Sequence, residues 1–398
     1  MGNAVSRKHQ NFRAANRTVA TFALAVAWVA ILVFGSSGAE PEERPPKPGS
    51  GLLYTNDIDP MGPWSVHVVR VDRSRREFKF TTTLGGIECL GMSTLTDQLK
   101  GFPRDLGQPL AAVNGDFYEK TKESAGRPRD LQIREGELLT HPAGHSSFWI
   151  DANGLPHMTN VFSRFRVVWP DGAATPFNLN APRSNHTAVL YTWAIGKSTH
   201  TRGGVEYVLE RGKESGPWLP LRPGLVYHAK IREVRTAGDS PVAVGVAVLS
   251  LSPETAASRP MLQPGAVLTL ITETIPDLSG AEVAIGGGPA LLMRGKPMPT
   301  RDFLSMRHPR SAFGWNERYY FLVEVDGRQI DLSVGMTFPE LTDYMLKLGC
   351  DYALNFDGGG SAAMWLFGVV RSSPSEGRER PSPNALVVVK REAAKESE

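Results

Sequence analysis

The sequence predicts an α+β fold built from mixed, largely antiparallel sheets with few helices. Short apolar runs of strand length recur along the chain with turn residues between them, whereas only two or three segments have helical periodicity. The contents of hydrophobic residues (41%) and charged residues (21%) are ordinary for a globular protein. We therefore expect one folded domain over residues 52–390, with Gly-rich loops at strand ends forming its functional site.

The middle of the chain, residues 140–285, is richest in candidate strands, which predicts a strand-rich subdomain there. The expected strands cover residues 163–169, 187–193, 205–209, 226–234, 242–249 and 266–272. Residues 119–136 are charged and contain Gly and Pro, so we expect a surface loop in that segment.

The first 39 residues have the pattern of a secretory signal peptide. Basic residues precede an apolar run, and Ser37 and Ala39 fit the small-x-small rule, which predicts cleavage after Ala39 and a secreted or periplasmic protein. The alternative is an uncleaved membrane anchor over residues 18–34, although this run is short for a span of about 20 residues. Residues 40–51 are expected to be a Pro-rich linker, and residues 391–398 a charged tail.

Charge and cysteine content exclude some classes of partner and site. The formal net charge is +3, and the predicted signal peptide carries four basic and no acidic residues, so the remainder has a net charge of −1. Nucleic acid is therefore not expected as a partner. Cys89 and Cys350 could form a disulfide after export or remain two buried thiols. No spacing of Cys and His indicates a zinc site, and no metal ligand is assigned.

The first polar loop follows a short helix and a buried strand. Leu95 and Leu99 lie four residues apart, which predicts a helix ending near Gly101. The apolar run of residues 110–113 then leads directly into Asn114-Gly115-Asp116. Two further strands are expected upstream, at residues 64–71 and 78–83.

The same order of helix, strand and polar Gly loop recurs near the C-terminus. Thr337 and Glu340 form a capping-box pattern that predicts a helix over residues 338–348, followed by a strand over residues 352–356. Asp357-Gly358-Gly359-Gly360-Ser361 comes next, before an expected strand over residues 363–370. An internal repeat would bring this loop and the Asn114–Asp116 loop together. Plain hairpin turns are the alternative for both.

Several of these segments resemble the phosphodiester glycosidase family. The longest is Leu348 to Ser361, which reads Leu-Gly-Cys-Asp-Tyr-Ala-Leu-Asn-Phe-Asp-Gly-Gly-Gly-Ser. The other blocks lie before and after it, in the order expected for the family: Ala112 to Tyr118, Gly286 to Leu291, Arg307 to Gly314, and Gly377 to Arg380 with Asn384 to Leu386. The resemblance covers about residues 60–390 and implies a hydrolase that cleaves the glycosidic bond of a small or polymeric sugar-1-phosphodiester, with no cofactor required.

That reaction sets chemical demands that particular residues can meet. Asp357 at a strand end is the candidate nucleophile, base or electrostatic stabiliser of an oxocarbenium-like transition state. Arg310 is the main candidate for phosphate, because its planar guanidinium can bind two oxygens at once. The remaining candidates are catalytic Asn114 and the substrate-binding residues Asp116, Gly287, Gly288, Arg307, Asn355, Gly358, Gly359, Gly360, Ser361, Arg380 and Asn384. The amides of the two Gly-rich loops are expected to contact an anion. The family often has Gly or another small residue at the position of Asp116, which argues against a catalytic role for it.

Two alternatives use the same fold. A divalent cation held by Asp116, Glu119 and Asp357 would instead support hydrolysis of a phosphodiester P–O bond. A non-enzymatic protein of the cell envelope could use the same pocket to bind glycans. His308 is expected to be structural or exposed.

Overall fold

The computed structural model describes residues 51–119, 126–213, 216–299 and 306–391, all of which belong to one compact unit. The predicted signal peptide and its anchor alternative lie outside the described residues, as do the linker apart from Gly51 and the tail apart from Arg391. Within the described ranges, no helix is both long and apolar enough to cross a membrane.

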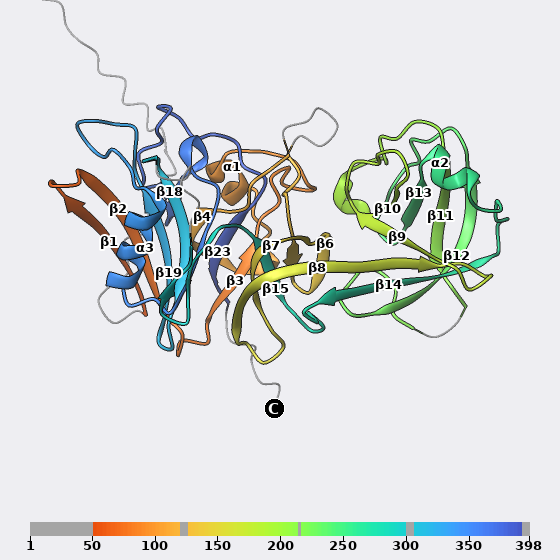
Figure 1. Ribbon diagram of the computed structural model, residues 1–398, viewed down its shortest axis with the longest axis horizontal. Coiled ribbons are helices and arrows are strands. Elements are labelled where there is room, and N and C mark those ends of the chain that lie inside the picture. The colour runs from red at the N-terminus through yellow and green to blue at the C-terminus, as the bar shows by residue number, and fades with distance from the viewer. Residues whose placement is uncertain (1–50, 120–125, 214–215, 300–305, 392–398) are drawn as a thin grey trace, which may run out of the picture. The chain divides into compact units, whose positions relative to one another are not determined.

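The chain is mostly β-sheet with few helices, and nearly all strand pairs are antiparallel; β9 and β10 pair in parallel (Figure 1). A seven-stranded sheet has the order β1 (Leu52–Asp59), β2 (Trp64–Asp72), β19 (Tyr319–Val325), β18 (Arg310–Trp315), β20 (Tyr352–Asn355), β16 (Ala290–Met293), β17 (Lys296–Pro297). A five-stranded sheet has the order β22 (Val369–Val370), β21 (Met364–Leu366), β4 (Gln108–Asn114), β23 (Ala385–Lys390), β3 (Phe78–Thr82).

The third sheet has eleven strands. Their order is β14 (Val267–Ile275), β12 (Val226–Arg235), β11 (Val205–Arg211), β13 (Ala247–Leu251), β10 (Ala188–Tyr191), β9 (Ala174–Leu179), β8 (Pro156–Val168), β7 (Ala143–Ile150), β15 (Val283–Gly286), β5 (Gln132–Arg134), β6 (Glu137–Thr140). The helical segments are α1 (Leu95–Lys100), α2 (Pro253–Ala257), α3 (Phe338–Lys347) and the 3-10 turns Arg104–Leu106, Trp193–Ile195 and Gly359–Ser361.

The seven-stranded and five-stranded sheets pack face to face. Side chains alternate between the two faces of each strand, so successive residues lie in different cores. Phe313 of β18 lies in the core between these sheets, with Val113 of β4 and Leu386 of β23. Ala312, one residue earlier, faces the opposite side, where it shares a core with Leu341 of α3. Helix α3 thus covers the outer face of the seven-stranded sheet, and α1 covers the outer face of the five-stranded sheet.

Strand β8 connects the two parts of the eleven-stranded sheet. It pairs with β7 on one side and with β9 on the other, and its later residues, Phe162–Val168, also pair with β14. The pairing of β8 with β14 closes strands β14, β12, β11, β13, β10, β9 and β8 into a ring, whose interior holds a large apolar core. Figure 1 shows β8 as one long strand that runs beside β14.

Two local expectations are wrong. The strand expected over residues 363–370 is divided into β21 and β22, because Phe367 and Gly368 turn the chain with positive φ values of 46° and 88°. The surface loop expected over residues 119–136 contains β5 and the fully buried Asp130. The charged residues of this segment were expected to be exposed. The Asp130 carboxylate is instead buried and accepts hydrogen bonds from backbone N–H groups such as that of Leu131 at 2.7 Å. Cys89 and Cys350 are free thiols.

Candidate functional site

The sequence blocks predicted for the site come together because they lie at aligned strand ends. In the five-stranded sheet, Asn114 at the end of β4 pairs with Ala385 at the start of β23. In the seven-stranded sheet, Asn355 at the end of β20 pairs with Ala312 near the start of β18. The polar loops that follow or precede these strands therefore meet at one edge of the two packed sheets.

Asn114 connects the two polar loops. Its side-chain Nδ2 donates to the carbonyl oxygen of Asp357 at 2.7 Å, and the Asp357 N–H donates to the carbonyl of Gly115 at 2.9 Å. The Oδ1 atom of Asn114 accepts from Ser311 Oγ at 2.6 Å and from the Ala363 N–H at 3.1 Å. The predicted meeting of the two loops is thus confirmed, and a fully buried amide fixes it.

Asp116 is buried beneath the site. Its carboxylate accepts from the Phe117 N–H at 2.8 Å and the Asp130 N–H at 2.7 Å, while its own N–H donates to Asn384 Oδ1 at 2.9 Å. Burial raises the pKa of Asp116 to about 7, although the positive charge of Arg129 opposes the rise. Asn384 in turn donates to Gln132 Oε1 at 3.0 Å, so both residues support the loop from below.

The Gly286–Gly288 loop provides close packing rather than free amides. The three N–H groups donate within the protein, to the carbonyls of Leu131, Ser146 and Asn355 respectively. A Cβ on Gly287 would lie 2.7 Å from the Asn355 carbonyl oxygen, so only glycine fits there. Asn355 Nδ2 donates back to the carbonyl of Gly288 at 2.8 Å.

The Asp357–Ser361 loop lies against two guanidinium groups. Gly359 has φ +62°, its N–H donates to the Pro309 carbonyl at 2.9 Å, and a Cβ on it would lie 3.0 Å from Arg328 Nη2. The Arg380 guanidinium contacts the backbone of Gly360 and pairs with Glu376. Asp357 is among the negative charges that raise the pKa of Arg380, after the larger effect of Glu376.

Two polar atoms beside this loop are buried with no hydrogen-bond partner among the described residues. They are Ser361 Oγ and Asn355 Oδ1. Buried polar atoms are ordinarily satisfied, so these two atoms depart from the usual pattern.

The two arginines of the Arg307–Gly314 block have internal partners. Arg310 is buried, donates from Nε to the Met336 carbonyl at 2.8 Å and from Nη2 to the Met306 carbonyl at 2.9 Å, and lies 3.9 Å from the centre of the Phe338 ring. Burial and nearby Arg328 lower its pKa to about 10. Arg307 forms an ion pair with Glu340 in the first turn of α3.

Sequence reasoning missed Arg328 and Arg129. Arg328 follows the Asp326-Gly327 turn, and only the pairing of β19 with β18 places it beside the Gly359 loop. Arg129 lies in the segment expected to be a surface loop; it stacks on Phe117 at 4.3 Å, and its positive charge opposes the rise in the pKa of Asp116.

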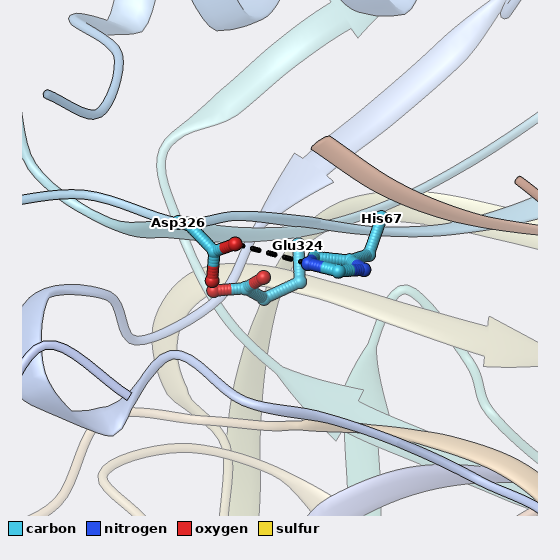
Figure 2. A group of neighbouring side chains, drawn as sticks. All are labelled: His67, Glu324 and Asp326. Atoms are coloured by element: carbon cyan, nitrogen blue, oxygen red, sulfur yellow. Dashed lines mark hydrogen bonds and ion pairs between the residues drawn. The ribbon is translucent and has the colours of Figure 1, made fainter. Parts of the chain in front are cut away.

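Figure 2 shows three described residues whose side chains are close enough together to hold a metal ion: His67, Glu324 and Asp326. Their ligand atoms lie within 4.8 Å of one another, and His67 Nε2 is 3.0 Å from Asp326 Oδ2. Burial raises the pKa of Glu324 well above its usual range, and Asp326 adds to the rise. Asp116, Glu119 and Asp357 do not form such a group among the described residues.

Comparison with solved structures shows what this fold is similar to. A hypothetical protein from Synechocystis has 17% sequence identity and a TM-score of 0.65, and the match covers 85% of this chain and 61% of that one. A Burkholderia pseudomallei protein described as exported has 22% identity and a TM-score of 0.63, with 82% and 74% covered. These two share the fold. This chain spans about three fifths of the length of the Synechocystis protein.

The zebrafish N-acetylglucosamine-1-phosphodiester alpha-N-acetylglucosaminidase catalytic domain, auto-inhibited by its pro-peptide, has 15% identity and a TM-score of 0.44, with 85% and 82% covered. No curated protein matches the sequence. Residues 227–389 match the family model of the phosphodiester glycosidases, and this segment carries Arg310, Asp357 and Arg380. The resemblance predicted from the sequence blocks is thus confirmed over residues 227–389, which are similar to the phosphodiester glycosidase family.

Proposed function

We propose that the protein is a hydrolase that cleaves the C1–O bond of a sugar-1-phosphodiester and releases the sugar and a phosphomonoester. The observation that carries the proposal is the placing of two guanidinium groups, from Arg328 and Arg380, against the glycine loop that begins with Asp357. A diester of this kind presents both a sugar carbon that becomes positive in the transition state and a phosphate that departs with negative charge. A carboxylate and a pair of arginines match those two ends.

In the proposed reaction the Asp357 loop acts at the sugar carbon C1, and the arginines act at the phosphate. The C1–O bond breaks, its electron pair stays on the phosphate oxygen, and water supplies the hydroxyl group at C1 and a proton. The carboxylate of Asp357 stabilises the developing positive charge or attacks C1. Arg328 and Arg380 bind the phosphate oxygens through charge-assisted hydrogen bonds. A phosphomonoester is a weak base, so the leaving group needs little protonation.

The other candidates receive supporting roles in this proposal. The Asn114 side chain positions Asp357 by donating a hydrogen bond to the backbone carbonyl of Asp357. Ser361 Oγ and Asn355 Oδ1 are suited to sugar hydroxyls, since each lacks a partner among the described residues. Arg310 adds buried positive charge behind the loop, where its Cα lies 3.7 Å from a Cβ built on Gly358. The buried Asp116, Asn384 and Gly286–Gly288 form the layer beneath.

Assay of a panel of sugar-1-phosphate diesters, including an N-acetylglucosamine-1-phosphodiester, tests the proposal. Release of free sugar and an intact phosphomonoester is the expected result, and it should persist when a chelator is present. Release of sugar-1-phosphate that stops on chelation would instead identify a metal-dependent phosphodiesterase. Tight binding with no product would identify a glycan-binding protein.

We also propose that the protein is exported. The basic, apolar and small-residue regions before Ala39 support this, and the Burkholderia pseudomallei protein of similar fold is described as exported.

A further inference from the structure

We propose that His67, Glu324 and Asp326 bind a divalent transition-metal ion, Zn²⁺ or Mn²⁺, at a site separate from the Asp357 loop. The three side chains come from two neighbouring strands and the turn after one of them. His67 of β2 is the direct cross-strand partner of Glu324 of β19, and Asp326 lies two residues beyond Glu324. Strand periodicity puts all three on one face.

That face is the inner one. Val69 of β2 and Leu322 of β19, two residues away on the same strands, belong to the core between the seven-stranded and five-stranded sheets. The three candidate ligands are accordingly 1–3% exposed. Figure 2 shows their polar atoms turned toward one another.

The donor geometry suits a small cation. Metal–nitrogen and metal–oxygen bonds of about 2.0–2.2 Å place ligand atoms on one ion roughly 3–4 Å apart. The three donors already lie within 4.8 Å of one another, and two of them are 3.0 Å apart. One imidazole and two carboxylates form a mixed ligand set that favours Zn²⁺ or Mn²⁺ over Mg²⁺ and Ca²⁺, which prefer oxygen alone.

Outer contacts hold the ligands in place, as they do in metal centres. Tyr54 OH lies 2.8 Å from His67 Nδ1, which leaves Nε2 directed at the carboxylates. Ser65 Oγ donates to Asp326 Oδ2 at 2.8 Å, and the Ser373 N–H donates to Asp326 Oδ1 at 2.6 Å. Glu324 Oε2 is buried and has no hydrogen-bond partner among the described residues. A metal ion at this position would supply its missing partner.

The negative charge of the two carboxylates is a second reason to expect a cation here. Two carboxylates lie together in a buried space, and among the described residues neither forms an ion pair with Lys or Arg; His67 is the partner of Asp326. Buried charges need a counter-charge. A divalent cation with a neutral imidazole balances both carboxylates.

Such an ion would fix the turn that carries Arg328. Asp326 is followed by Gly327, on which a Cβ would lie 2.6 Å from the Pro309 nitrogen, so the turn packs against the segment entering β18. The ion would tie β2, β19 and the Ser373 segment together at this point. This role is structural, and the proposal stands apart from the reaction proposed above.

Metal analysis of the full chain tests the proposal. Protein is stripped with chelator, loaded with Zn²⁺ or Mn²⁺, freed of excess ion and analysed by mass spectrometry for bound metal. We expect one ion per chain in the wild type, a raised Tm on loading, and loss of both in Glu324→Gln, which keeps the shape but removes the charge. Glu206→Gln is the matched control, because Glu206 is a buried carboxylate bonded to Thr201 and Ser250 in another sheet.

Several results would overturn the proposal. A wild type that retains no ion, with Glu324→Gln at least as stable, would show that a proton alone satisfies the carboxylates. Equal metal content in wild type and folded Glu324→Gln would place the ion elsewhere. Preferential binding of Ca²⁺ or Mg²⁺ would do the same, because this ligand set favours Zn²⁺ or Mn²⁺. If Glu324→Gln does not fold, the visible spectrum of Co²⁺-loaded wild type and of His67→Gln decides. An imidazole-dependent band supports the site, and its absence from the wild type excludes it.

Discussion

Asn114 shows how one buried side chain can join two sheets at a functional edge. Its amide accepts two hydrogen bonds and donates a third, to the Asp357 carbonyl. Each partner left unsatisfied in a buried site costs about 1–3 kcal/mol. The position of the proposed catalytic carboxylate therefore depends on the hydrogen bonds of the Asn114 side chain.

Asp357→Asn tests the carboxylate directly. Because the amide keeps the shape and loses the charge, kcat should fall by about 10²–10⁴-fold with a smaller effect on KM. Steady-state kinetics on a sugar-1-phosphodiester measures both constants. Asp351→Asn, just before the start of the same strand, is the matched control and should stay active. A folded Asp357→Asn enzyme with near-normal turnover would remove Asp357 from the mechanism.

Asp116 should make stability depend on pH. Its pKa is raised from 3.8 to about 7 in the folded protein, so between these values the folded state holds a proton that the unfolded state releases. The free energy of unfolding should therefore fall as pH rises through this window, by at most about 1.4 kcal/mol per pH unit from this group. Urea unfolding of wild type and Asp116→Asn across the window measures it. The variant should lose this part of the slope, and equal slopes would contradict the assignment.

At the scale of elements, the glycine loop is shaped by what lies against it. A Cβ on Gly360 would meet the Arg380 guanidinium and the Glu376 carboxylate, although the φ of Gly360 is not in the left-handed region. Gly360→Ala should therefore displace Arg380 without straining the backbone. Loss of a charged hydrogen bond of about 1.5–3 kcal/mol predicts a fall of roughly 10–100-fold in kcat/KM.

Thermal unfolding and kinetics separate the two effects of Gly360→Ala. Its Tm should stay within a few degrees of the wild type while kcat/KM falls. Gly216→Ala is the control, because a Cβ there meets nothing within 4 Å. Unchanged kcat/KM in Gly360→Ala would show that Arg380 does not contact the phosphodiester.

Elements with strong local signals were predictable from the sequence. Helix α3 begins at the expected capping box, with Thr337 and Glu340 bonded to each other, and β20 follows it as expected. Strand β9 and the β5–β6 pair were not predicted, because short strands owe their stability to neighbours distant in sequence. The surface position expected for Asp130 from its charge was wrong, since its buried carboxylate is bonded to backbone N–H groups and to His145.

The same limit applies to the site. Asp357 and Asn114 stand out in the sequence because each lies where an apolar strand gives way to glycine. Arg328 does not stand out, because a single arginine after a turn is ordinary. Only the register of β19 against β18 brings it to the loop. Conversely, Arg310 was expected to face the phosphate, whereas its side chain donates to the Met306 and Met336 carbonyls.

At the scale of the whole molecule, the proposed site draws on residues from Asn114 to Asn384, so it needs both packed sheets. Export would deliver this folded unit without its first residues. Protein recovered from the exported fraction should begin at Glu40, because the small residues Ser37 and Ala39 fit the cleavage rule. N-terminal sequencing measures this. An intact Met1 on a membrane-bound product would favour the anchor over residues 18–34.

The proposed function depends on cleavage of the C1–O bond. Hydrolysis in oxygen-18-labelled water shows which bond breaks. Cleavage of the C1–O bond puts the labelled oxygen on the sugar and leaves the phosphomonoester unlabelled, whereas cleavage of a P–O bond labels the phosphate. Mass spectrometry of the two products of a sugar-1-phosphodiester distinguishes these outcomes in one reaction. We predict label in the released sugar alone, and label in the phosphate product would contradict the proposed glycosidase.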